Sequence, residues 1–368
     1  MKRKYHSAIG LLVLTMFLIV ALGSEVQAEK VWRVGISTTS LRTDWSWGQD
    51  VYQAFKYIDE NYPNVKATFT DALKLEEIRT VAQDWADQGY DLIVGYGYEF
   101  LDDYVEVAKA HPNSWFLISC APHMASDKYP KNLVSVYYLE EEAGYLLGSL
   151  AALLSKTNKV GVLGALEIPC TVKGMNGFRK GAYDVKPDIN VMYTYIGSYT
   201  DPAGEREATE SMIDAGADSI WEFWLSLGVG EAAQARKVNY FGSHYSRMQL
   251  PGFSLADFVG SCMPIADVME MMMEGTLKGT TYYVGVESGY TGVVVETERL
   301  PGDALKELSA IQAKVASGEI QVPKFMRTMP ATWPRQAVTN VEQYREPYFG
   351  EFTNLIAASP RLRDKKGK

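Results

Sequence analysis

Aromatic side chains follow several of the short apolar runs that predict strands in this sequence. Trp45 and Trp47 come after one such run, Tyr96 and Tyr98 after a second, and Trp224 after a third. A planar heterocycle held between two rings gains roughly 1–3 kcal/mol for each stacked face, on the scale known for single-stranded bases. These residues therefore predict a site that clamps a planar ligand by stacking. For Tyr96, support of a turn is an equal alternative.

Polar side chains near these rings could bind the edge of such a ligand. Gln49 can hydrogen-bond to ring nitrogens or to an exocyclic amine, while Glu99 and Glu167 follow predicted strands and could face the same cleft. An ordinary exposed carboxylate is the alternative for both glutamates. Asp50 and Asp201 each stand where a helix N-cap belongs, and we expect both to cap rather than to bind.

The elements that must position these side chains alternate along the chain. From residue 32 onward, short apolar runs alternate with helical periodicity. After a long helix at 139–154, whose small residues at 143, 144, 148 and 151 are available for close packing, the alternation starts again. Strands that alternate with helices form parallel sheets covered on both faces, so the pattern predicts an α/β protein with two doubly wound lobes. Loops at the carboxyl ends of parallel strands hold small molecules. The loop at 44–50 is therefore expected to form the first wall of the site.

The two lobes are expected to exchange segments late in the chain. No structureless stretch is long enough for a flexible linker, which predicts a hinge of short crossovers. The first lobe is predicted to contain residues 29–137 and 261–288, the second 138–260 and 289–323, and a C-terminal extension 324–368. Predicted strands lie at 34–36, 65–69, 91–94, 115–120, 133–136, 160–163, 191–195, 219–223, 239–242 and 282–286, and the segment 292–296 is expected to return to the second lobe. Predicted helices lie at 51–62, 76–88, 100–110, 139–154, 174–183, 203–214, 228–236, 265–274 and 304–317.

The first 28 residues have the pattern of a secretory signal peptide. A basic start at Lys2, Arg3 and Lys4 precedes an apolar run at 9–22, which is short for a membrane anchor, and Ala28 suits cleavage. We therefore expect export to the periplasm or another extracytoplasmic compartment. The net charge of −9 becomes more negative once this basic segment is removed. An acidic product argues against nucleic acid or an anionic membrane as partner.

The remaining residue types give no sign of catalysis. The sequence has no His-Glu-x-x-His, Gly-x-Ser-x-Gly or P-loop motif and no aspartate cluster for calcium, so no cofactor or metal is expected. Cys120, Cys170 and Cys262 are widely spaced, and we interpret them as free thiols, although one pair could bridge in an oxidising compartment. The methionines at 269–273 fall on a predicted helix and are expected to fill core.

An ordered set of short runs resembles the basic membrane protein family of ABC-transporter solute-binding proteins, which includes purine nucleoside receptors. The runs extend across almost the whole predicted mature chain, up to about residue 323. They are 44–50, Gly-Tyr-Gly-Tyr at 95–98, Glu-Glu-Glu-Ala-Gly-Tyr-Leu-Leu-Gly at 140–148, Lys-Val-Gly-Val-Leu-Gly at 159–164, Gly-Phe at 177–178, Gly-Ser-Tyr-Thr-Asp-Pro at 197–202, Gly-Ala-Asp at 216–218 and Ser-Gly-Glu-Ile at 317–320.

The resemblance implies a type I periplasmic binding fold in which two lobes close over a purine-like ligand. Trp47 falls where the family has its stacking aromatic, and Trp224 would close over the other face of the ligand by hinge motion. The implied partners are a small heterocycle and an ABC permease, and the implied state is a monomer. Two alternatives stay open, a ligand-sensing module for a receptor and a nucleoside-processing enzyme.

Two positions depart from the family pattern. After a predicted strand that ends in glycine, this chain has His244 within Gly-Ser-His-Tyr-Ser at 242–246, without the aspartate associated with ribose hydroxyls, and Gly48 replaces an asparagine. A site built for ribose should keep such partners, because buried polar groups left unpaired cost roughly 1–3 kcal/mol. The departures favour a free nucleobase, with a nucleoside second, and they add His244 to the candidate ligand-binding residues.

Overall fold

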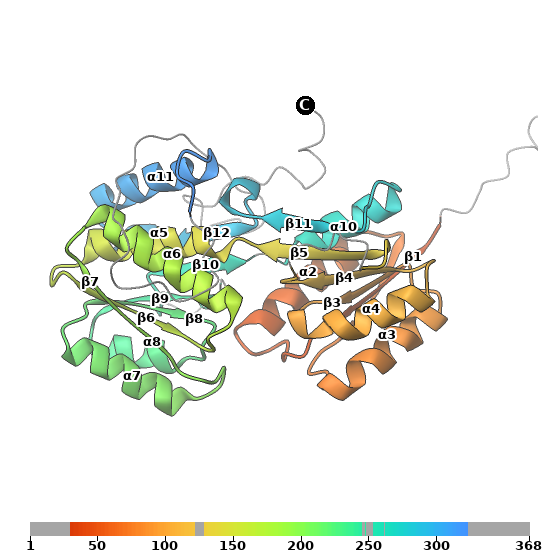
Figure 1. The fold of residues 1–368 in the computed structure, drawn as a ribbon, viewed down its shortest axis with the longest axis horizontal. Coiled ribbons are helices and arrows are strands. Elements are labelled where there is room, and N and C mark those ends of the chain that lie inside the picture. The colour runs from red at the N-terminus through yellow and green to blue at the C-terminus, as the bar shows by residue number, and fades with distance from the viewer. Residues whose placement is uncertain (1–29, 122–128, 245–246, 248–252, 261, 323–368) are drawn as a thin grey trace, which may run out of the picture.

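The computed structural model describes residues 30–121, 129–244, 247, 253–260 and 262–322. Their strands form two six-stranded sheets, with strand orders β11-β5-β4-β3-β1-β2 and β12-β10-β9-β8-β6-β7. Figure 1 shows the two sheets beside each other, each with helices on both faces. We refer to each sheet with its helices as a lobe. The predicted α/β class with two doubly wound lobes is thus confirmed.

The first lobe is built mainly from the N-terminal third of the chain. Its helices α3 and α4 cover one face of the sheet in Figure 1, and α2 and α10 cover the other. The strands are β1 (Trp32–Ser37), β2 (Val65–Thr70), β3 (Leu92–Gly95), β4 (Trp115–Ser119), β5 (Leu133–Tyr138) and β11 (Thr281–Val284). The helices are α2 (Trp47–Asn61), α3 (Ile78–Asp87), α4 (Leu101–Ala110) and α10 (Pro264–Met273), with short 3-10 turns η1 (Leu75–Glu77) and η2 (Tyr98–Phe100).

The second lobe repeats this plan. In Figure 1 the helices α5, α6 and α11 lie on one side of its sheet and α7 and α8 on the other. The strands are β6 (Lys159–Gly164), β7 (Asn190–Tyr195), β8 (Ser219–Phe223), β9 (Asn239–Gly242), β10 (Ala256–Gly260) and β12 (Thr291–Val295). The helices are α5 (Glu140–Leu154), α6 (Pro169–Val185), α7 (Pro202–Asp214), α8 (Gly228–Ala235) and α11 (Gly302–Ala316), and the 3-10 turns are η3 (Val286–Ser288) and η4 (Thr297–Arg299).

Short segments carry the chain between the lobes. Only Leu139 separates β5 from α5, and η3 lies between β11 in the first sheet and β12 in the second. Among the described residues, every pair of neighbouring strands is parallel except β12 with β10, an antiparallel edge that the sequence did not reveal. In the first sheet Ser37 pairs with Gly95, so the loops after β1 and β3 leave the sheet side by side. This register brings the aromatic residues of both loops to one edge.

Helix α2 begins earlier than the sequence suggested. The helix starts at Trp47 rather than at residue 51, and it ends at Asn61. Asp50 is consequently inside the first turn and is not an N-cap, which corrects that prediction. Asp44 takes the capping role, because its carboxylate accepts hydrogen bonds from the backbone N–H groups of Ser46, Gly48 and Gln49 at 2.7, 3.0 and 3.2 Å. Asp201 does cap α7, through the backbone N–H of Gly204.

Helices α5 and α6 pack at very short range. A Cβ atom on Gly144 or Gly148 of α5 would collide with the backbone carbonyl of Gly174 or Phe178 of α6. The sequence-based expectation that small residues of this helix serve close packing is confirmed. This contact fixes α6 against α5, the helix that follows the crossover at Leu139 from the first lobe.

We expect Gly148→Ala to lower the free energy of unfolding by at least about 1–3 kcal/mol, because the added methyl group must push the two helices apart. Urea unfolding of the purified protein measures the change. Gly302→Ala is the matched control, since a Cβ at this first residue of α11 meets no atom within 4 Å. The control should leave stability unchanged or slightly raised. Equal stability of the two variants would contradict the close packing of α5 on α6.

The methionine-rich helix belongs to the core. Met269, Met271 and Met272 on α10 are buried in the hydrophobic cluster of the first lobe, and Met273 packs against it from the edge. The core interpretation of this run is therefore confirmed. In the part of the chain that the structure describes, no helix is both long and apolar enough to cross a membrane.

Candidate ligand-binding site

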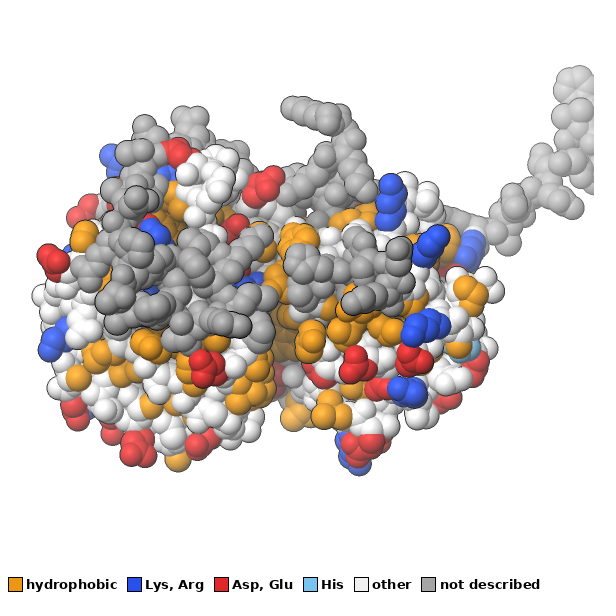
Figure 2. All heavy atoms as spheres, in the orientation of Figure 1, with side chains coloured by type: hydrophobic (Ala, Val, Ile, Leu, Met, Phe, Trp, Pro, Cys, Tyr) orange, Lys and Arg blue, Asp and Glu red, His pale blue; other side chains and the backbone are white. Residues whose placement is uncertain are grey.

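A cavity of about 580 Å³ lies between the two lobes. Figure 2 shows the furrow that separates the lobes, with hydrophobic side chains along it. The cavity is lined by residues that follow β1, β3 and β4 of the first lobe and β6, β7, β8 and β9 of the second. Its volume is in the range of sites that enclose a small organic molecule. Carboxyl ends of strands from both sheets thus converge on one site.

Trp47 forms the aromatic wall on the first lobe. Its ring stacks on Tyr96 with centroids 5.3 Å apart and an interplanar angle of 16°, and its Nε1–H donates to the Tyr96 carbonyl oxygen at 2.8 Å. The ring of Tyr138 meets Trp47 edge-on at 6.1 Å. Tyr96 is fully buried and does not line the cavity. Tyr96 therefore supports Trp47 from behind, which agrees with a supporting role rather than with direct ligand contact.

Trp224 faces Trp47 from the second lobe. The two ring centroids lie 6.4 Å apart with planes inclined at 46°. Trp224 directly follows β8 and has a positive φ of 62°, an uncommon backbone conformation for a bulky residue. Its indole Nε1 is buried and has no hydrogen-bond partner within the described residues. The pair therefore offers one aromatic face from each lobe, together with one unused donor.

Two predicted ligand residues of the first loop lie elsewhere. Trp45 has 37% of its surface exposed and does not line the cavity, although it is only two residues before Trp47. Gln49 is also absent from the lining, and its backbone N–H is used by the Asp44 cap. The cap turns the chain between these residues, and the sequence spacing alone gave no sign of which tryptophan would face the ligand. Asp44 and Ser46 line the cavity instead.

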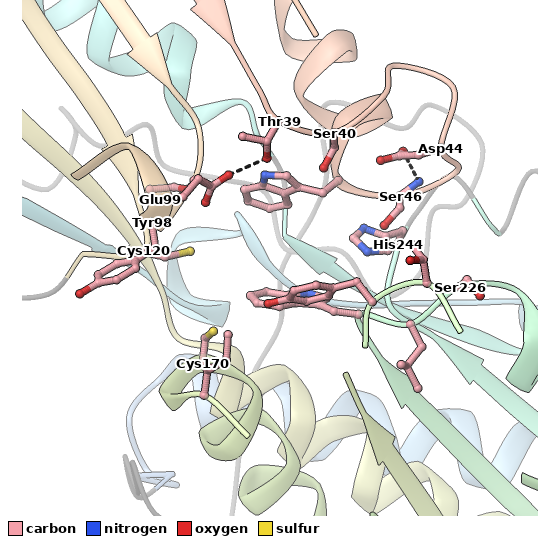
Figure 3. A pocket seen from close by; sticks show the side chains of 18 of the residues that line it. Thr39, Ser40, Asp44, Ser46, Tyr98, Glu99, Cys120, Cys170, Ser226 and His244 are labelled. Atoms are coloured by element: carbon pink, nitrogen blue, oxygen red, sulfur yellow. Dashed lines mark hydrogen bonds between the residues drawn. The ribbon is translucent and has the colours of Figure 1, made fainter. Parts of the chain in front are cut away.

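Asp50 and His244 join the two lobes at one end of the cavity. His244 Nδ1 lies 3.1 Å from Asp50 Oδ2, and the His244 side chain is only 3% exposed. Burial raises the pKa of Asp50, and the hydrogen bond from His244 opposes that shift. His244 Nε2 is buried without a partner among the residues described. Figure 3 shows His244 beside Ser46, across the cavity from Cys120 and Cys170.

Arg247 is a cavity-lining cation that sequence analysis missed. It is almost fully buried, forms an ion pair with Glu222, and donates to the Tyr240 hydroxyl at 3.1 Å and to the Leu225 carbonyl. Burial lowers the pKa of Arg247 to about 10. Its Nε has no hydrogen-bond partner in the described part of the chain. No local pattern marks this arginine, because its main partner is 25 residues away on β8.

The opposite end of the cavity is more open. Tyr98 is 59% exposed at the mouth, and Glu99 accepts a hydrogen bond from Thr39 Oγ1 at 2.7 Å. Both residues line the cavity, as their place in the sequence suggested. Glu167 is exposed and lies outside the lining, which fits its alternative as an ordinary surface carboxylate.

All three cysteines are free. Cys120 and Cys170 line the cavity from different lobes, and Cys262 is buried in the first lobe. Burial raises the pKa of Cys170 to about 12 and that of Cys120 well above its usual value. Since the thiolate is the reactive form, these side chains act as neutral, soft parts of the wall.

A buried ionic cluster lies beside the thiols where the chain enters the second lobe. Lys173 of α6 pairs with Glu140 and Glu141 at the start of α5, and the three side chains are at most 1% exposed. Lys173 also donates to the Tyr138 carbonyl at 2.6 Å. Burial raises the pKa of Glu140 to about 7. Burial alone would lower the pKa of Lys173, but the two carboxylates outweigh it and raise that pKa.

The geometry of the lining supports binding by stacking and hydrogen bonding. Within the described residues, no group of three or more His, Cys, Asp or Glu side chains is placed to hold a metal ion. Three nitrogen atoms of the lining, on Trp224, His244 and Arg247 of the second lobe, have no partner among those residues. The lining therefore offers a ligand one indole face from each lobe and three nitrogen atoms without a partner among the described residues.

Comparisons with known proteins identify a matching family and similar sequences. The family model described as "ABC transporter substrate-binding protein PnrA-like" matches residues 32–325. A purine-binding protein of Brucella abortus is 28% identical over 304 residues, which cover 81% of this chain and 85% of the relative. A putative ABC transporter glucose-binding protein of Haloferax volcanii is 23% identical over 286 residues, covering 76% and 70%.

The fold is likewise found among solved structures. An ABC transporter solute-binding protein from Conexibacter woesei superimposes with a TM-score of 0.70 at 22% identity, over 80% of this chain and 99% of that one. This likeness shows the two-lobed architecture of solute-binding proteins of the type I periplasmic class.

Proposed function

Because the chain belongs to the family of PnrA-like ABC transporter substrate-binding proteins, we propose that it captures a purine base or nucleoside between its lobes. The observation that carries this proposal is the facing of Trp47 and Trp224 across the cavity, one from each lobe. A purine is flat and rich in ring nitrogens, so it suits two indoles and the unused nitrogen atoms beside them. The relative named as purine-binding supports the same ligand class.

To capture a ligand, the two lobes must first move slightly apart. Carbon atoms in contact lie about 3.5–4.0 Å apart, so a ring held between two others needs about 7–8 Å between the outer planes. The Trp47 and Trp224 centroids are 6.4 Å apart and their planes are inclined at 46°. Ligand entry therefore has to separate the indoles by about 1 Å and turn them toward parallel. The short crossovers between the lobes provide the hinge for this motion.

The protein is proposed to act outside the cytoplasm, after removal of residues 1–28 as a signal peptide, and to deliver its ligand to an ABC permease as a monomer. A receptor-linked sensor would use the same cleft. Capture of the permease subunits from membranes by the ligand-loaded protein supports delivery. Capture of a receptor or kinase without a permease would favour the sensor instead.

The test is mass spectrometry of small molecules released from the denatured protein, followed by calorimetric titration with adenine, guanine, adenosine, guanosine and glucose. We expect at least one purine to bind with micromolar or tighter affinity and glucose not to bind. Binding of glucose with no response to any purine would overturn the proposed ligand class. Analysis of the titrated purines afterwards tests the enzyme alternative, since conversion of adenosine to adenine would show catalysis.

A further inference from the structure

We infer that the cavity selects a purine whose imidazole ring carries a free N–H, which is an unsubstituted base rather than a nucleoside, and that His244 accepts this N–H. The inference rests on the proposed function, because it specifies which purine the same site prefers. It assigns to His244 the role of a specificity-determining residue. A nucleoside lacks the imidazole N–H because the sugar replaces it.

The hydrogen bond to Asp50 fixes the orientation of the imidazole. Nδ1 lies 3.1 Å from the Asp50 carboxylate, and we assign the proton of this contact to Nδ1, so that the carboxylate accepts. In the neutral imidazole Nε2 is then an acceptor with a lone pair. Nε2 belongs to a cavity-lining side chain, is buried and has no partner among the residues described. A buried acceptor of this kind is costly to leave unused, so a ligand N–H opposite it gains affinity.

Two donors lie on the same wall as this acceptor. Trp224 Nε1 and Arg247 Nε are both buried without a hydrogen-bond partner in the described part of the chain, and both side chains line the cavity. The second lobe thus offers two donors and one acceptor. A free purine base presents ring nitrogens that accept hydrogen bonds next to one ring N–H that donates, and this pattern is complementary to the wall.

The carboxylates of the cavity already accept hydrogen bonds from the protein, which makes them weaker partners for a ribose. Hydroxyl groups of a sugar bind best to ionised acceptors. The two carboxylates that line the cavity, Asp44 and Glu99, accept from the start of α2 and from Thr39. Glu205 behind Ser226 accepts from that hydroxyl and from the Gly228 backbone. A vicinal diol would have to share these acceptors with the protein groups that already donate to them.

The experiment compares adenine with 7-methyladenine and 9-methyladenine by calorimetry, on the wild-type protein and on His244→Leu. We expect adenine to bind the wild type at least about tenfold more tightly than either methylated base, because each lacks the imidazole N–H. In His244→Leu, adenine should lose about tenfold in affinity and its advantage over the methylated bases should shrink to about threefold or less. If the methyl groups weaken binding only by steric clash, His244→Leu will prefer adenine over the methylated bases as strongly as the wild type does. That result would overturn the inference.

Two further variants control the result. His244→Gln keeps an acceptor oxygen and should restore part of the preference for adenine. His111→Leu removes another histidine near a carboxylate, 3.7 Å from Asp87 and outside the cavity, and should leave all affinities unchanged. Equal binding of adenine and 9-methyladenine by the wild type overturns the inference while the proposed function stands. Absence of binding by every purine overturns the proposed function itself.

Discussion

Replacement of Trp47 by alanine is expected to weaken purine binding by about ten- to hundredfold. The indole supplies one stacking face of the cavity, and loss of a stacked face costs roughly 1–3 kcal/mol. Calorimetric titration of adenine against the wild type and Trp47→Ala measures the change. The substituted site also loses the hydrogen bond to the Tyr96 carbonyl, so the lobe wall becomes both smaller and less ordered.

Trp45→Ala is the matched control for this variant. Trp45 lies two residues earlier in the same loop, is 37% exposed and does not line the cavity. We expect its replacement to change the affinity less than twofold. If Trp47→Ala bound adenine as tightly as the parent, or if the two variants were equally impaired, the aromatic clamp would be refuted. Thermal melting of both proteins separates a loss of binding from a loss of folding.

Lys173→Met is expected to destabilise the protein by about 3–5 kcal/mol. The substitution removes the cation that two fully buried carboxylates, Glu140 and Glu141, share, and an uncompensated buried charge costs this much. The free energy of unfolding in urea measures the loss. Because Lys173 also donates to the Tyr138 carbonyl at the end of β5, the variant weakens the junction where the chain passes between the lobes.

Two further variants test the electrostatic origin of that loss. Lys109→Met breaks the ion pair between Lys109 and Glu106, two side chains that are 53% and 56% exposed. This variant should change the free energy of unfolding by less than about 1 kcal/mol. Combining Lys173→Met with Glu140→Gln and Glu141→Gln removes the unpaired charges and should recover part of the lost stability. Lys173→Met with wild-type stability, or a triple variant less stable than the single one, would contradict an electrostatic cause.

The fold was largely predictable because its signals are periodic and local. Alternating apolar runs and amphipathic segments located most strands and helices of both lobes, and Gly144 and Gly148 indicated the close packing of α5. The start of α2 was wrong by four residues, because Asp50 resembles an N-cap as closely as Asp44 does. The antiparallel pairing of β12 depends on a long-range neighbour and has no local signal.

The site was predictable only at the level of loops. Residues that follow strands do converge on the cavity, yet whether Trp45 or Trp47 faces it depends on the turn that Asp44 makes with the backbone of α2. Tyr96 was rightly connected to the site but lies behind it. Arg247 escaped notice because its burial depends on Glu222, a partner on another strand. Three-dimensional neighbours decide these roles, and sequence spacing does not encode them.

The position of β11 has a consequence for how the protein folds. β11 pairs with β5 in the first sheet, although residues 281–284 follow nearly the whole of the second lobe in the chain. A chain that has not yet docked this strand leaves the edge of β5 open, and open edges pair readily with other chains. Contacts between such distant segments form slowly because a long loop must close first. The first sheet is therefore completed only after the chain has passed through most of the second lobe, and we expect the two lobes to fold as one cooperative unit.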